Sequence, residues 1–492
     1  MTRVVDRSRR GFLHPQLAPA GAGPAVRREF DQILCATLLC LLILSITLGP
    51  RLRAGYLSHQ RAVDLRPQDL LLIPAAFVVL AHLASPVRPV LRRWWALWSG
   101  FCLLAAGTTI LHLLISGEAT VPTRLAFLGR GIELVLIVGV VCGLYRQCGP
   151  SRLRLVHGTL LSAAFANAAW CLYQAYTGRP RTLLGGEVGS AIESYGPKLV
   201  GEPSAFGAGA FFVFVAVLAI ARYRGGLGSR PVSVALLVAA AVCTYLAQSR
   251  AALVAIACLM VIFILSADHA ATTSRLGKVT LLATAAVPIV LAWDGPVSPR
   301  LTESGVMAST EVRLAEVWTP ITHLLVNDPL VGLLGVGPGG LATKTVPQTE
   351  AHNAVLRAWL DYGLVGGAVL LLAIGSALWY AYRTARSSTA SRSLRFHADL
   401  VWLFGVAVLV LGTVQDALTP VTSSHLLMLA IGLFAGELSH ATVAERDGGG
   451  PARAPAGSVG YRSRGRWRMT PRRAAGPASW RVAGSASWRA AG

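Results

Sequence analysis

A single histidine at the start of an apolar segment is the residue of this sequence best placed to do chemistry. His352 is followed by Asn353 and then by an apolar run with helical spacing. On a helix, Gly363 lies on roughly the same face as His352 and Gly366 lies close behind, so another helix could approach the backbone there. A histidine in this place can act as a catalyst, or it can be a polar anchor for the helix. This segment alone leaves both roles open.

Basic residues near the same segment are candidates for binding anionic groups. Arg250 interrupts two apolar runs, and Arg313 and Lys344 lie in the long segment before His352. An arginine that flanks a helix is commonly an interfacial anchor, so Arg250 alone does not indicate a site. The glycine run at 335–340 superficially resembles a phosphate-binding loop, but it follows no predicted strand and has no adjacent Lys-Ser/Thr. We therefore reject a nucleotide site and expect a tight, irregular turn.

Two pairs of charged residues lie inside apolar runs. Arg130 and Glu133 are three residues apart, and Arg357 and Asp361 are four apart, so each pair can form an ion pair on one helix face. Charged residues within the membrane are costly and are usually paired or functional. For Arg130 and Glu133 the alternatives are a structural ion pair and a role in a lipid pathway.

The composition indicates whether these residues belong to a soluble protein or to a membrane protein. The 492 residues are 54% hydrophobic and 14% charged, with a mean hydropathy of +0.56, whereas a soluble domain carries about 25% charged residues. The net charge of +22 would suggest a nucleic-acid partner in a soluble protein. Here the basic residues lie mainly in short loops and at the two ends, which indicates a membrane protein and no nucleic acid. The eight cysteines show no metal-ligand spacing, so we expect neither disulfides nor a zinc site.

Apolar runs of about 20 residues, the length that spans a bilayer, recur along the chain. We predict an all-α polytopic membrane protein with about 12 transmembrane helices and no cleaved signal peptide. The predicted spans are 31–49, 69–85, 94–116, 125–145, 155–177, 204–222, 232–248, 251–267, 279–293, 363–382, 398–417 and 421–440. The bias of Lys and Arg toward one side places both termini in the cytoplasm.

The longest connection, 294–351, then lies outside the cytoplasm and joins the ninth and tenth spans. It contains a predicted helix that begins near Thr310, is kinked or restarted at Pro320 and ends at Asn327-Asp328-Pro329. Its apolar face consists of Val317, Trp318, Ile321, Leu324 and Leu325. We therefore expect a partly helical, folded extracytoplasmic loop within a transmembrane domain that covers 31–440.

The two tails are basic. Residues 1–30 form a predicted cytoplasmic N-terminal tail, and 441–492 form a cytoplasmic tail rich in Gly, Ala, Ser and Arg. Such a composition cannot bury a core, so disorder is expected for the C-terminal tail. Its arginines and tryptophans could instead bind the anionic inner leaflet.

The pattern of His352-Asn353, nine residues, and Gly363-Leu364-Val365-Gly366 resembles the signature of the O-antigen ligase and polymerase superfamily. In that family the signature lies where the long outer loop joins the next span. Arg250 matches the essential arginine at the outer end of a helical hairpin, and Arg313 matches a second arginine in the loop. Glu202-Pro203-Ser204 resembles an element common in the polymerase branch. Gly367 stands where members often have Thr, a minor departure.

The resemblance implies transfer of a glycan from a polyprenyl-diphosphate carrier to an acceptor hydroxyl at the outer face of a bacterial inner membrane. It implies that Arg250 and Arg313 neutralise the diphosphate and that His352 accepts or orients the proton of the acceptor hydroxyl. The implied substrate-binding residues are Asn353, Glu202, Lys344, Gly363 and Gly366. The outer loops hold no Asp-x-Asp pair, so we predict a metal-independent glycosyltransferase without cofactor.

Alternatives within and outside this superfamily stay open. Ligase, polymerase and protein O-glycosyltransferase share the same chemistry and differ in the acceptor, which is a lipid-anchored sugar, a growing glycan or a protein side chain. A transporter is the rival of another class, because twelve spans with both ends inside is its usual count. The two halves show no clear repeat, and polar residues collect at the outer surface and not at mid-membrane.

Overall fold

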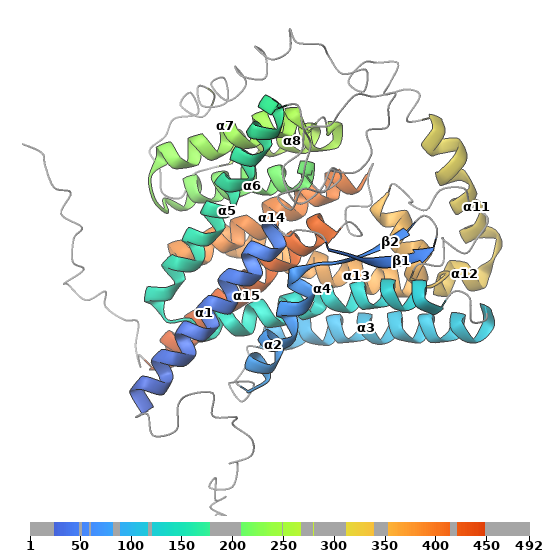
Figure 1. The fold of residues 1–492 in the computed structure, drawn as a ribbon, viewed down its shortest axis with the longest axis horizontal. Helices are drawn as coiled ribbons and strands as arrows, with labels where there is room; N and C mark the ends of the chain where they lie inside the picture. The colour runs from blue at the N-terminus through green and yellow to red at the C-terminus, as the bar shows by residue number, and fades with distance from the viewer. Residues whose placement is uncertain are drawn as a thin grey trace, which may run out of the picture. The chain divides into compact units, whose positions relative to one another are not determined.

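The computed structural model describes the helical part of the chain (Figure 1). Described are residues 24–48, 52–58, 61–81, 89–116, 121–177, 208–247, 249–266, 279, 311–338, 353–413 and 421–447. The long helices are α1 (Pro24–Leu48), α2 (Pro67–Ala81), α3 (Pro89–Ser116), α4 (Val121–Gln147), α5 (Pro150–Thr177), α6 (Ala208–Gly225), α7 (Arg230–Leu246), α8 (Arg250–Leu265), α13 (Ala354–Ala385), α14 (Arg392–Gly412) and α15 (Val421–Asp447). Between α8 and α13 lie η4 (Arg313–Trp318), α11 (Thr319–Asn327) and α12 (Pro329–Leu334).

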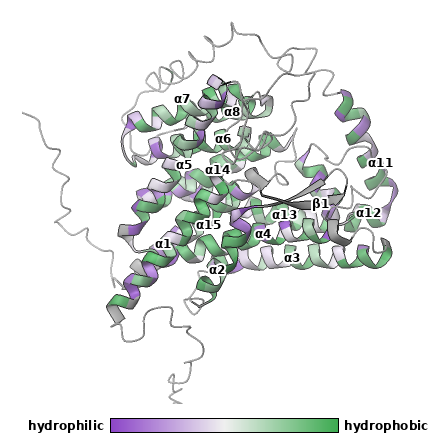
Figure 2. Ribbon diagram, viewed as in Figure 1, coloured by the Kyte–Doolittle hydropathy of each residue, from purple (hydrophilic) through white to green (hydrophobic). Residues whose placement is uncertain are grey.

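The described helices are those of a polytopic membrane protein. Seven are long and apolar enough to cross a membrane, namely α1, α3, α4, α5, α6, α13 and α14, and α2, α7 and α8 are shorter apolar helices. Figure 2 shows hydrophobic residues predominating along α3, α4 and α13. Eleven of the twelve predicted spans overlap a described helix, while 279–293 lies outside the described residues except for one position. The total of twelve therefore stays a prediction, as do the tails at 1–30 and 441–492, which lie mostly outside.

The described helices support the predicted all-α class, and one short two-stranded hairpin accompanies them that the sequence did not predict. Strands β1 (Leu52–Ser58) and β2 (Arg61–Leu65) pair antiparallel, with Leu52 opposite Leu65. Strands of seven and five residues are too short to span a membrane. The sequence prediction relied on apolar runs of about 20 residues, so it did not detect strands this short.

The helices alternate in direction, which brings several helix starts to one end. Near the C-terminal end of α6, Arg224 contacts Asp399 near the start of α14 at 3.3 Å, so α6 and α14 are antiparallel. A Cβ on Gly209, at the start of α6, would lie 2.5 Å from the Oγ of Ser249, which directly precedes α8. At the C-terminal ends of the same helices, the rings of Tyr223 and Phe263 are 5.5 Å apart, so α6 and α8 are parallel.

Asn353 completes this end, which we call the site end of the helices. Its side-chain amide donates to the carbonyl of Thr413, just beyond α14, at 3.2 Å. The starts of α6, α8 and α13 and the end of α14 therefore lie at the site end. Arg250 is the first residue of α8, and His352 directly precedes Asn353, the cap of α13, in the sequence.

Candidate functional site

The structure describes some of the predicted site residues and not others. His352, Glu202 and Lys344 lie outside the described residues. Arg250 is the first residue of α8, but its side chain is not among those described, and Arg313 is the first residue of η4. The loop helices and the first turns of α13 are described in full, so they define the geometry around the attachment point of His352.

Asn353 is the N-cap of α13. Its Oδ1 accepts hydrogen bonds from the backbone N–H groups of Val355 and Leu356, each at 3.0 Å. Such a cap satisfies backbone donors that would otherwise lack partners at the start of the helix. Its Nδ2 donates to the carbonyl of Thr413, so the described contacts of Asn353 hold the start of α13 in place. They also fix the point from which His352 extends. The predicted role of Asn353 in substrate binding stays a prediction.

Gly363 breaks α13 at a position that only glycine tolerates. Its φ of 67° and ψ of −179° lie in a region essentially restricted to glycine. A Cβ there would collide with the carbonyl of Leu333 at the end of α12. Gly335, the C-cap of α12, has a φ of 77°, and a Cβ on it would lie 2.5 Å from the backbone nitrogen of Gly363. Gly363 of the histidine motif and Gly335 of the glycine run therefore lie in contact, backbone against backbone.

This contact confirms the predicted close approach at Gly363, although the approaching segment is the loop helix α12 and not a spanning helix. The backbone N–H of Val336 donates to the carbonyl of Leu360 at 2.7 Å, and Nε1 of Trp359 donates to the carbonyl of Gly332 at 2.8 Å. At Gly366 a Cβ would meet only the side chain of Tyr362 in the same helix. The approach at Gly366 was thus wrongly predicted.

The loop helix has the predicted apolar face. Pro320 lies in the first turn of α11, where the π-helical geometry of η4 gives way to an α-helix, so the helix restarts there as expected. A small core fixes this helix to α13 and consists of Val317, Ile321, Leu325, Val331, Val336 and Leu360, with Trp318, Leu324, Leu356 and Trp359 partly buried around it. The described part of the loop, 311–338, is folded onto the site end, and Arg313 begins the helix that is docked there.

Two residues that hold the glycine turn were missed from the sequence. Nε2 of His112, near the end of α3, donates to the carbonyl of Gly335 at 2.8 Å. Arg124, near the start of α4 and 2% exposed, donates to the carbonyl of Val336 at 2.7 Å. No local pattern reveals these two contacts, because the partners lie more than 200 positions away in the sequence. The turn at 335–336 is therefore held by contacts from three helices. His112 belongs to α3, Arg124 to α4 and Gly363 to α13.

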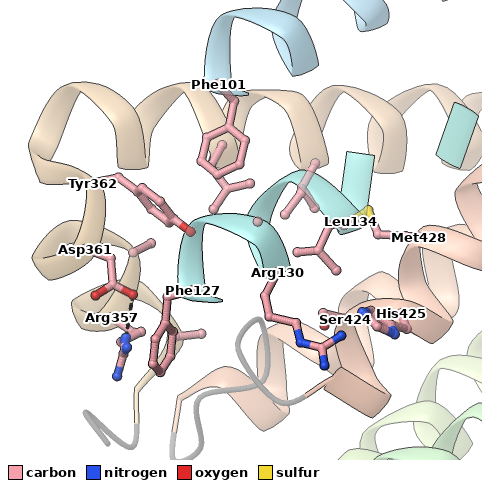
Figure 3. A pocket seen from close by; sticks show the side chains of 15 residues that line it. Phe101, Phe127, Arg130, Leu134, Arg357, Asp361, Tyr362, Ser424, His425 and Met428 are labelled. Carbon is pink, nitrogen blue, oxygen red and sulfur yellow. Dashed lines mark hydrogen bonds and ion pairs between the residues drawn. The ribbon is translucent and has the colours of Figure 1, made fainter. Parts of the chain in front are cut away.

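A cavity of about 170 Å³ lies between α4, α13 and α15, directly beyond the cap of α13 (Figure 3). Ala354, two positions after His352, is part of its wall. The remaining wall mixes aromatic and apolar residues with polar ones, namely Phe101, Phe127, Arg130, Gly131, Leu134, Arg357, Ala358, Asp361, Tyr362, Leu370, Ile374, Ser424, His425 and Met428.

Both predicted ion pairs are present at this cavity. Arg357 Nε bonds to Asp361 Oδ2 at 2.6 Å, and both side chains are buried. Arg130 bonds to Glu133 at 2.6 Å and also to Asp69 of α2 at 2.8 Å, a partner that its sequence spacing did not reveal. The arginines in the cavity wall are thus held by carboxylates.

A second buried polar cluster lies at the opposite end of these helices. Tyr145 donates to Glu437 at 2.8 Å, and the Nε2 atoms of His157 and His397 are 3.2 Å apart. Between the two clusters α4 and α15 pack tightly, because a Cβ on Gly432 would lie 2.7 Å from the Cβ of Val141. Apolar packing therefore separates the two polar ends along this pair of helices.

Comparisons with known proteins add no identification. No protein-family model matches the chain, and no curated protein is significantly similar to it. The resemblance to the O-antigen ligase and polymerase superfamily therefore rests on the sequence features alone.

Proposed function

We propose that this chain transfers a glycan from a polyprenyl-diphosphate carrier to an acceptor hydroxyl at the outer face of a bacterial inner membrane. The observation that carries the proposal is the geometry of Gly363, the first glycine of the motif. Its positive φ and its contact with Gly335 join the long loop to the helix that begins just after His352. This gives a physical reason for a glycine at this distance from the histidine.

The reaction follows from the chemistry of the three predicted catalytic residues. The acceptor oxygen forms a bond to the anomeric carbon of the donor sugar while the bond from that carbon to the diphosphate oxygen breaks. His352 takes or orients the proton of the acceptor hydroxyl, and general-base assistance of this kind contributes about 10²–10⁴-fold. Arg250 and Arg313 stabilise the negative charge on the departing polyprenyl diphosphate, because a guanidinium matches phosphate oxygens in a bidentate manner. We propose that no metal ion takes part.

The arrangement of the helices supports this assignment of roles. The start of α8, which is Arg250, and the start of α13, which follows His352, both lie at the site end. Arg313 begins the helix whose apolar face docks on α13. With both termini in the cytoplasm, as the charge bias predicts, the site end faces outward.

Transport is the less favoured function. A transporter has its substrate site near the middle of the membrane, commonly at broken helices. The apolar contact of Gly432 with Val141 occupies the region between the two polar clusters of α4 and α15, and the break in α13 lies at the docked loop. Ligase, polymerase and protein O-glycosyltransferase differ only in the acceptor, and all three fit this arrangement.

The test is a transfer assay in membranes with a labelled polyprenyl-diphosphate glycan. We expect His352→Ala, Arg250→Ala and Arg313→Ala each to insert normally and to lose transfer. Arg392→Ala, an exposed arginine at the start of α14 and thus at the opposite end, is the matched control and should remain active. Full activity in all three site variants would refute the mechanism. Loss of activity of the purified protein on adding a chelator would refute the metal-independent reaction.

A further inference from the structure

A groove of about 490 Å³ lies between α2 and α4, separate from the cavity beyond the cap of α13. This volume is in the range of small-molecule sites, which is about 300–1,000 Å³. Three charged residues line the groove, namely Asp69, Arg130 and Glu133, and we call them the charged triad. The rest of its wall is apolar and consists of Leu72, Ile73, Ala76, Phe77, Leu80, Ala126, Gly129 and Leu136. The groove therefore joins a charged patch to an apolar channel.

The charged triad lies toward the site end. Asp69 is in the first turn of α2, and Arg130 of α4 bonds to it at 2.8 Å and to Glu133 at 2.6 Å. Arg130 also lines the cavity beyond the cap of α13, which is at the site end. Farther along both helices, a Cβ on Gly143 would lie 2.5 Å from Cγ1 of Val79, so α2 and α4 are parallel. The apolar part of the groove thus extends away from the site end.

The length of the apolar part matches one leaflet of a membrane. From Asp69 to Leu80 the helix rises about 16 Å, because an α-helix rises 1.5 Å per residue. The hydrocarbon core of a bilayer is about 30 Å thick, so one leaflet contributes about 15 Å. Ile73, Phe77 and Leu80 are exposed and recur at helical spacing along this length. A lipid with its headgroup at the charged triad would therefore lay an acyl chain along these side chains.

The charges of the groove favour a headgroup with an ammonium group. Its wall holds one guanidinium and two carboxylates, and the side chain of Arg130 is 34% exposed. Arg66 and His425 also approach the triad, but both are buried and lie outside the groove wall. A primary ammonium can donate hydrogen bonds to the carboxylate of Asp69, while a phosphate is attracted to Arg130. A headgroup with a net negative charge would instead meet an excess of carboxylates.

We infer that the groove between α2 and α4 binds one molecule of phosphatidylethanolamine in the leaflet at the site end. The ammonium group lies at Asp69, the phosphate lies at Arg130, and one acyl chain runs along Ile73, Phe77 and Leu80. The ion pair of Arg130 and Glu133, for which the sequence left a structural role and a lipid role open, then forms part of a lipid site. This inference does not depend on the proposed glycosyl transfer.

Two exposed helix glycines provide a matched pair of variants. Gly129 lines the groove, whereas Gly375 lies in α13 and outside the groove wall, and nothing lies within 4 Å of a Cβ at either position. Leucine has a higher helix propensity than glycine, so both helices should tolerate the change. Gly129→Leu obstructs the groove, and Gly375→Leu leaves it open. Asp69→Asn keeps the size of the side chain and removes its charge.

The experiment compares the lipids found at two exposed positions. The photo-crosslinker p-benzoylphenylalanine replaces Phe77 in the groove, which is 68% exposed, or Leu372 of α13, which is 62% exposed and serves as the control position. The full chain is placed in nanodiscs of equal amounts of phosphatidylethanolamine and phosphatidylglycerol with a little polyprenyl phosphate, and mass spectrometry identifies the adducts.

The ratio of phosphatidylethanolamine to phosphatidylglycerol adducts should be at least about threefold higher at position 77 than at 372, which is the scale of an exposed charge interaction. Gly129→Leu and Asp69→Asn should each lower the ratio at 77 to that at 372, and Gly375→Leu should leave it unchanged. Equal ratios at the two positions would overturn the inference, as would enrichment of phosphatidylglycerol or polyprenyl phosphate at 77. An unchanged ratio in Gly129→Leu or in Asp69→Asn would overturn it too. Because no transfer is measured, these results are independent of the assay with His352→Ala.

Discussion

Gly363→Ala is predicted to release the long loop from α13. The alanine would occupy a backbone region essentially restricted to glycine, which costs about 1–3 kcal/mol. Its Cβ would also collide with the carbonyl of Leu333, and overpacking of this kind costs about 1–3 kcal/mol. Together these amount to about 2–6 kcal/mol, and since about 1.4 kcal/mol is tenfold, docking of the loop weakens by at least about 30-fold.

A thiol at Val331 reports on this docking. Val331 is 4% exposed in the small core between α12 and α13, so Val331→Cys should react slowly with a membrane-impermeant maleimide. Adding Gly363→Ala should raise the rate at least about tenfold, toward that of Leu333→Cys, whose wild-type side chain is 52% exposed. Gly375→Ala is the control, because nothing lies within 4 Å of a Cβ there. If Gly363→Ala left the labelling rate unchanged, the contact between Gly335 and Gly363 would not be what docks the loop on α13.

Three further predictions concern the buried ion pair, the turn and the topology. Asp361→Ala should leave Arg357 buried without its carboxylate and cost about 3–5 kcal/mol; thermal unfolding in detergent should show this loss, and Arg357→Met combined with Asp361→Leu should recover most of it. Arg124→Ala removes a charged hydrogen bond to the carbonyl of Val336, worth about 1.5–3 kcal/mol. It should speed protease cleavage of the loop, and unchanged cleavage would argue against this role. A cysteine at position 340 should react with an impermeant maleimide in intact cells, and reaction only after permeabilisation would reverse the orientation.

The positions of most helices along the chain could be predicted from the sequence, because they depend on local composition. Long apolar runs must be helical in lipid to satisfy their backbone groups, so eleven predicted spans overlap described helices. The ion pairs Arg130–Glu133 and Arg357–Asp361 were also predictable, since residues three or four apart are neighbours on any helix. The short β-hairpin was missed because its pattern is weak at that length.

The contacts that assemble the candidate site join segments that are distant in the sequence. Nothing near Arg124 indicates that it binds the carbonyl of Val336, and nothing near Arg130 indicates Asp69 as a partner. Spacing suggested that Gly363 permits a close approach, but only the tertiary structure identifies the loop helix α12 as the approaching segment.

The sequence by itself therefore determined the membrane class of the chain, its helices, and the motif around His352, because each of these depends on residues close together along the chain. The tertiary structure decided that the glycine turn docks on the break at Gly363 and that a cavity with paired charges lies beyond Asn353. Both features depend on which faces of separate helices meet. That choice is made by packing across the whole chain, and no local pattern encodes it.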